Sequence, residues 1–176
     1  MTGPAPFKQG RAKQDRAEQG RAEQGPGDSH IARTYALLGG QGTIGKPVRT
    51  PLEAHDMLMG GLPSAALLHL TREAAFLGTQ GLLDKTIGIS LRTLQRRKKD
   101  VAETFLSVEQ SNRTWKFAEI LGRAGDILGS KPAAEAWMNQ PAIGLDQRRP
   151  VDLLATSVGI EAVETYLTRI DYGVYA

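Results

Sequence analysis

The chain contains no cysteine among its 176 residues. Disulfide frameworks, thiolate metal sites and a thiol nucleophile are therefore excluded, and this absence is compatible with the cytosol. No run of apolar residues approaches the length that crosses a bilayer, and the N-terminus lacks the apolar core of a signal peptide. We therefore expect a soluble, cytoplasmic protein.

The charge of the chain is also modest, with 23% charged residues, a formal net charge of +3 and a pI near 9.3. Any binding of nucleic acid must therefore depend on a local basic patch, because the surface as a whole is not strongly positive. The length leaves room for one ordinary domain or two small domains and a tail.

The pattern of residues needed for an enzyme is missing too. The three histidines, His30, His55 and His69, lie on different predicted elements, and His69 stands in an apolar helix where a structural role is the favoured interpretation. No segment assembles a nucleophile, a base and an oxyanion donor. We predict a protein that is not a catalyst and that binds no metal and no cofactor.

The N-terminal residues 1–28 are rich in Gln, Gly, Ala, Arg and Glu and contain the repeat RAEQG at 16–20 and 21–25. They have no apolar stripe to bury, so we predict a disordered tail. Residues 29–50 are predicted to be a glycine-rich linker. Their segment Gly39–Pro47 resembles a phosphate loop, but Pro47 stands where that loop needs Ser or Thr.

From Pro51 onward the apolar residues recur at spacings of three and four, which is typical of helices. The first helix should span Pro51–Met59, and after a break at Gly60 and Gly61 the pattern resumes at Pro63. No alternating pattern of a strand is convincing. The sequence therefore predicts an all-α fold.

A basic segment follows Gly88, which should form a turn, and Ser90, which should cap the next helix after a helix that ends near Lys85. The segment Leu91–Lys99 contains no acidic residue. Its helix could enter a major groove, with Arg97, Lys98 and Lys99 placed to neutralise phosphates. The predicted DNA-binding residues are Ser90, Arg92, Thr93, Gln95, Arg96, Arg97, Lys98 and Lys99. A merely solvated helix face remains the alternative.

Two further helices are predicted downstream. Ser107 and Gln110 form a capping box at the start of a helix that runs to about Leu128, with Trp115 in the core. A helix that restarts at Lys131 carries Trp137, which we expect to pack the small C-terminal helices together.

The C-terminal segment is typical of a partner-docking module. A short helix should open at Pro150, Thr156 should cap a second, amphipathic helix, and an aromatic tail follows. Tyrosine is favoured at interfaces because it offers a large rigid face with a polar tip.

The strings GLDQRRPVDLLAT at 144–156, VETYLTRI at 163–170 and DYGVYA at 171–176 resemble the toxin-binding domain of Xre/MbcA/ParS antitoxins, the partners of RES-domain toxins. ISLRTLQRR at 89–97 is similar to the recognition helix of Xre-type regulators. The chain departs from the family pattern at Gln147, where many relatives have glycine, and at Ser157, where proline is common.

This resemblance implies an N-terminal helix-turn-helix bundle at 51–128, which binds DNA and dimerises, and a helical toxin-binding domain at 129–176. It implies an antitoxin of a type II toxin–antitoxin pair that covers the active site of an NAD-degrading RES-domain toxin and represses its own operator. A homodimer that forms a higher hetero-oligomer with the toxin is expected. The predicted toxin-binding residues are Arg169, Asp171, Tyr172, Gly173, Val174, Tyr175 and Ala176.

Two alternatives remain open at this point. The chain could be a stand-alone transcription regulator whose C-terminal helices only dimerise, or an adaptor that kept the fold and lost DNA binding.

Overall fold

The computed structural model describes residues 26–79, 81–99 and 104–173. The helices of the first half are α2 (Pro26–Leu37), α3 (Gly40–Ile44), α4 (Pro51–Met59), α5 (Ser64–Glu73), α6 (Leu82–Ile87) and α7 (Leu91–Arg97). Those of the second half are α8 (Val108–Ile127), α9 (Lys131–Asn139), α10 (Pro150–Leu153) and α11 (Ser157–Asp171). Two short 3-10 segments are η1 (Ala75–Gly78) and η2 (Ile143–Leu145). Over these residues β pairing is limited to two isolated bridges, so the predicted all-α class is confirmed.

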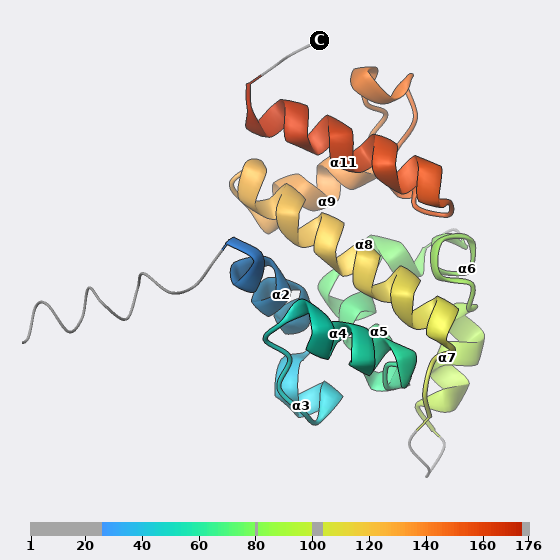
Figure 1. Cartoon of the computed structure of the whole chain (residues 1–176). Coiled ribbons are helices and arrows are strands. Elements are labelled where there is room, and N and C mark those ends of the chain that lie inside the picture. The colour runs from blue at the N-terminus through green and yellow to red at the C-terminus, as the bar shows by residue number, and fades with distance from the viewer. Residues whose placement is uncertain (1–25, 80, 100–103, 174–176) are drawn as a thin grey trace, which may run out of the picture.

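The long helix α8 runs through the middle of the molecule, as Figure 1 shows. Its predicted capping box is confirmed, because Ser107 Oγ accepts from the Gln110 N–H and Gln110 Oε1 accepts from the Ser107 N–H. Gly129 follows with a φ of 81°, the left-handed conformation that ends helices. Contacts with α2, α4, α6, α9 and α11 make α8 the element that joins both halves of the chain.

The core lies around α8 and α5. Phe117 is 1% exposed and its ring centroid lies 6.1 Å from that of Phe76. Trp115, predicted to lie in the core, is only half-buried. Two residues along a helix point about 200° apart, so Trp115 and Phe117 cannot face the same core. Trp115 instead lines a groove between α2, α4 and α8.

The predicted linker at 29–50 is wrong for most of its length, because α2 and α3 occupy it. The side chain of Leu38 at the end of α2 is fully buried. A Cβ atom added at Gly122 of α8 would lie 3.0 Å from Arg33 Cδ, so α2 packs closely against α8 there. This contact joins segments far apart in the sequence, so the spacing of residues within 29–50 does not show it.

Two of the glycines that suggested a linker cap α3, which itself contains Gly40 and Gly42. Gly39, with a φ of 90°, precedes this helix and Gly45, with a φ of 80°, follows it. Left-handed φ values are easily adopted only by glycine. Ile44 and Val48 are buried beside them. Of the predicted disordered tail, residues 26–28 belong to α2 and residues 1–25 lie outside the described residues.

The boundaries of α4 agree with the sequence prediction. Thr50 and Glu53 form a capping box, Pro51 is the first residue of the helix and Gly60 ends it. Pro63 stands at the cap position of α5 and is not its first residue. None of the described helices combines the length and the apolar character that crossing a membrane requires.

The small C-terminal helices also form as predicted. Pro150 opens α10, and Thr156 Oγ1 accepts from the Gly159 N–H at 3.1 Å to cap α11. A Cβ atom at Gly159 would lie 2.1 Å from the Leu153 carbonyl oxygen, so only glycine fits this corner. Figure 1 shows α11 lying across the upper side of the molecule, above α8.

Candidate functional site

The basic segment predicted to bind DNA begins at the cap of α7. Ser90 Oγ accepts from the Thr93 N–H at 3.2 Å, so the predicted cap is confirmed. Gly88 has a φ of 85° and makes the turn, and α6 ends at Ile87, two residues beyond the predicted end near Lys85. Leu94 is fully buried, which turns the polar side of α7 outward.

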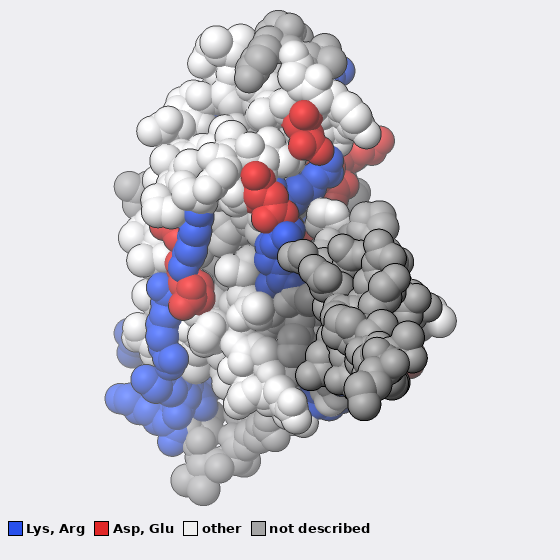
Figure 2. All heavy atoms as spheres, turned by 90° about the vertical axis from the view of Figure 1, so that its left-hand side faces the viewer, with Lys and Arg blue, Asp and Glu red and all other residues white. Residues whose placement is uncertain are grey.

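The basic side chains of α7 differ in their partners. Among the described residues, no ion pair involves Arg92 or Arg96. Arg97 differs, since its Nη1 donates to the Phe105 carbonyl oxygen at 3.3 Å. A hollow of about 370 Å³ is lined by Arg92, Thr93, Gln95, Arg96 and Lys99. On the face shown in Figure 2, Lys and Arg side chains gather at the lower left, and acidic side chains lie above them.

An apolar groove lies at the other end of the molecule, between α9, η2 and α11. The rings of Trp137 and Tyr166 stack with centroids 6.2 Å apart and planes at 25°. This contact agrees with the prediction that Trp137 holds the C-terminal helices together. A Cβ atom at Gly144 would lie 2.2 Å from Tyr166 Cε2, so the stacked position of Tyr166 requires glycine at 144.

The loop that carries Gly144 is held in a fixed shape. The Ala142 N–H donates to the Arg148 carbonyl oxygen at 3.1 Å, and the Gln147 N–H donates to the Ala142 oxygen at 3.0 Å. Asp146 and Gln147 have φ values of 52° and 59°. These left-handed conformations favour glycine, and Gln147 is one of the two positions at which the sequence departs from the family pattern.

The predicted toxin-binding residues stand at the end of α11. Arg169 and Asp171 lie in its last turn, Tyr172 is 78% exposed, and Gly173 is exposed with a φ of 67°. Tyr172 therefore does not fold back onto the body of the protein. Val174, Tyr175 and Ala176 lie outside the described residues.

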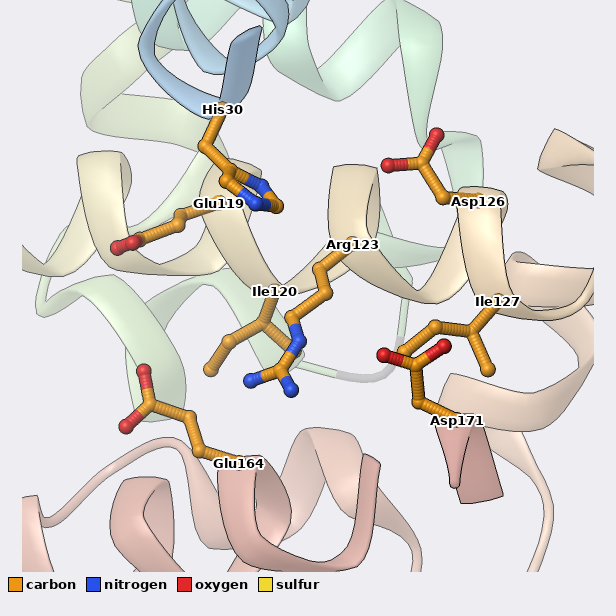
Figure 3. A pocket seen from close by; sticks show the side chains of 8 residues that line it. All are labelled: His30, Glu119, Ile120, Arg123, Asp126, Ile127, Glu164 and Asp171. Carbon is orange, nitrogen blue, oxygen red and sulfur yellow. The ribbon is translucent and has the colours of Figure 1, made fainter. Parts of the chain in front are cut away.

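A polar cleft of about 380 Å³ separates this end of α11 from α8 and α2. Figure 3 shows Arg123 pointing from α8 toward α11, between Glu164 and Asp171. Arg123 Nη2 donates to Thr168 Oγ1 at 2.8 Å. The hydrogen bond between Arg123 and Thr168 crosses the cleft and joins α8 to α11. Asp171 lines the same cleft as His30 and Asp126, residues that the sequence pattern had not connected with it.

Two carboxylates that join the C-terminal helices to the first half of the chain, Asp152 and Glu73, have lowered pKa values. The pKa of Asp152 is lowered, first by its hydrogen bond from Arg149 and then by that from Lys85 of α6, despite the opposing effect of burial. The pKa of Glu73 on α5 is lowered, chiefly by its hydrogen bond from Lys131 of α9. These charged contacts therefore connect the C-terminal helices to the helices near α7.

The histidines do not come together. His69 Nε2 lies 4.0 Å from Glu73 Oε1, a pair one helical turn apart, and His30 lines the cleft of Figure 3. The described part of the chain contains no group of three or more His, Cys, Asp or Glu side chains that could hold a metal ion.

Sequence reasoning missed the groove beside Trp137. Its outer edge is Ile143, which is 77% exposed. The signal in the sequence was Ile143 followed directly by Gly144, because an apolar residue in a glycine-containing turn can remain exposed. The stacking partner, Tyr166, lies too far along the chain for spacing to reveal.

Comparison with known proteins assigns this region. A family model described as the antitoxin Xre/MbcA/ParS C-terminal toxin-binding domain matches residues 123–173. A curated protein of Pseudomonas putida, "Antitoxin Xre", is 27% identical over 121 residues, which cover 69% of this chain and 72% of that protein. The matched segment contains the cleft residue Arg123, the groove and the described part of the predicted toxin-binding tail. Residues 123–173 are therefore similar to the C-terminal toxin-binding domain of Xre/MbcA/ParS antitoxins, and 121 residues of the chain are similar to a curated antitoxin of that type.

Proposed function

We propose that this chain is the antitoxin of a type II toxin–antitoxin pair and neutralises a RES-domain toxin that degrades NAD. In this proposal the C-terminal segment from Arg169 to Ala176 covers the active site of the toxin, which excludes its substrate. The observation that carries the proposal is the exposed end of α11, where Tyr172 is 78% exposed at the edge of the matched toxin-binding domain.

The chemistry of this end suits a buried contact. Burying an exposed tyrosine against a partner gains free energy from its apolar ring, and its hydroxyl group can still find a hydrogen-bond partner. Arg169 and Asp171 are exposed on either side of Ile170 and can pair with charges on the toxin. We propose that these pairs set the register of the tail in the active site.

We further propose that α6 and α7 act as a helix-turn-helix with which a homodimer represses its own operator. The left-handed turn at Gly88, the cap at Ser90 and the hollow lined by Arg92 and Arg96 of α7 support this role. A two-fold dimer would place two copies of α7 in successive major grooves. The two roles divide the chain into a module at 51–128 and a module at 129–176.

The proposal is tested by growth rescue. The cognate RES-domain toxin is expressed with the full antitoxin, with a variant that lacks residues 172–176, and with the Arg92→Ala, Arg96→Ala double variant as control. The full chain and the control should restore growth, and the truncated chain should not. Full rescue by the truncated chain would reject the role of the tail. Failure of the full chain to bind or rescue would favour the stand-alone regulator.

A further inference from the structure

We propose that an apolar segment of the toxin docks in the groove between α9, η2 and α11, so that the antitoxin holds its partner at a second place besides the tail. This inference rests on the proposed function, and it adds a contact that the C-terminal tail cannot provide. The groove has a volume of about 530 Å³, within the usual range of binding clefts. Its walls include Leu128, Ala133, Trp137, Pro141, Ile143 and Tyr166.

The groove lies wholly within the toxin-binding domain. All of its lining residues fall between 123 and 173, the segment that the family model matches. The polar cleft of Figure 3 is different, because His30 of α2 contributes to it. The groove is therefore continuous with a region already assigned to the toxin, which is why we assign it to the toxin and not to a second copy of this chain.

The lining also indicates the chemistry of the occupant. None of the side chains that line this groove carries a charge. Trp137 and Tyr166 supply two aromatic faces, and such residues dominate the binding energy of protein interfaces. An apolar segment of the toxin would fit here, whereas a charged segment would lose its hydration without finding a partner.

Ile143, one of the residues that line the groove, is exposed on an ordered loop. Ile143 is 77% exposed, and burying its apolar side chain against a partner is favourable because apolar surface leaves water. Its loop is fixed by the hydrogen bonds between Ala142, Gln147 and Arg148. Because the loop is already ordered, binding costs little conformational entropy. Gly144 leaves the space that Tyr166 needs to complete the wall.

A matched pair of variants tests this proposal. Ile143 and Val158 are both apolar, both in the toxin-binding domain and almost equally exposed, at 77% and 75%, but Val158 does not line the groove. Ile143→Arg and Val158→Arg are made in the full chain. Both should keep the thermal unfolding midpoint of the wild type, because both side chains point into solvent. A second groove variant, Ala136→Arg, changes the wall that α9 provides.

Binding to the purified RES-domain toxin is measured by titration calorimetry. Ile143→Arg and Ala136→Arg should weaken binding by at least about 30-fold, and Val158→Arg should stay within about 3-fold of the wild type. Equal affinity of all variants would overturn the groove proposal while leaving the proposed function intact. The same holds if Ile143→Arg only changes self-association in sedimentation, since a second copy would then be the occupant. No binding by the wild type would overturn both proposals.

Discussion

Lys85 on α6 donates a hydrogen bond of 2.9 Å to Asp152 Oδ1 on α10, so a single carboxylate ties the toxin-binding domain to the helix that precedes α7. Arg149 holds the same carboxylate from the other side, with Nε 2.6 Å from Oδ2 and Nη2 3.0 Å from Oδ1. The orientation of this carboxylate is therefore fixed by Arg149, the cap residue of α10, as well as by Lys85. Ordering it in this way lowers the entropic cost of the contact between the two halves.

The first prediction concerns the strength of this tie. A double-mutant cycle with Lys85→Ala and Asp152→Ala should give a coupling free energy of about 0.2 to 1 kcal/mol, because the Lys85 side chain is 55% exposed and solvent screens the pair. Asp152→Ala alone should cost about 1 kcal/mol or more, since it also removes the two hydrogen bonds from Arg149. Urea denaturation measures both values. A coupling of zero would show that the contact does not contribute to stability.

The second prediction concerns pH. The pKa of Asp152 in the folded chain lies below its ordinary value of 3.8, so the free energy gained from its ionised form is fully present above about pH 4. It should be lost as the pH falls through the lower folded pKa. Denaturation between pH 6 and pH 2 should show a smaller acid loss for Asp152→Asn than for the wild type. Equal acid losses would contradict the lowered pKa of this carboxyl group.

The third prediction compares two glutamines. Gln147 has a φ of 59° and Gln140 a φ of −109°, and both are exposed. Gln147→Gly should stabilise the chain by about 0.5 to 1 kcal/mol. The free energy that a side chain costs in the left-handed conformation is larger than the extra entropic cost of ordering glycine. Gln140→Gly should destabilise it by about 0.5 to 1 kcal/mol, since only the entropic cost remains. A change of the same sign in both variants would argue against strain at 147.

The fourth prediction concerns DNA. Arg92→Ala and Arg96→Ala should each weaken binding to the operator by about 1 to 3 kcal/mol, because each removes a contact to a base edge. Toxin binding should persist, as α7 lies outside the matched domain. Gel-shift titration at fixed salt measures the affinity. Unchanged affinity would mean that the basic face of α7 is only solvated.

The sequence was sufficient wherever a few neighbouring residues decide the structure. The predicted caps at Ser90, Ser107 and Thr156 each satisfy an amide within three residues of the cap, so local spacing reveals them. The basic face of α7 could be predicted in the same way, because burial of Leu94 fixes which side turns outward.

The rest depends on contacts between distant segments. Arg33 and Leu37 of α2 lie against the bare backbone at Gly122 of α8, a contact that spacing cannot show. The groove requires Gly144 to leave room for Tyr166, which then stacks on Trp137. Trp137, Gly144 and Tyr166 are each compatible with ordinary packing when taken alone. Only the structure shows that they lie together at the groove between α9, η2 and α11.

Hydrogen exchange of the full chain with and without the RES-domain toxin shows which surface of the antitoxin the toxin covers. We expect the toxin to slow exchange of backbone amides in α9, η2 and α11, including those beside Ile143 and Tyr172, and to leave α7 unchanged. Protection confined to α4–α7, with α9 and α11 exchanging as in the free chain, would show that the toxin does not bind the C-terminal helices.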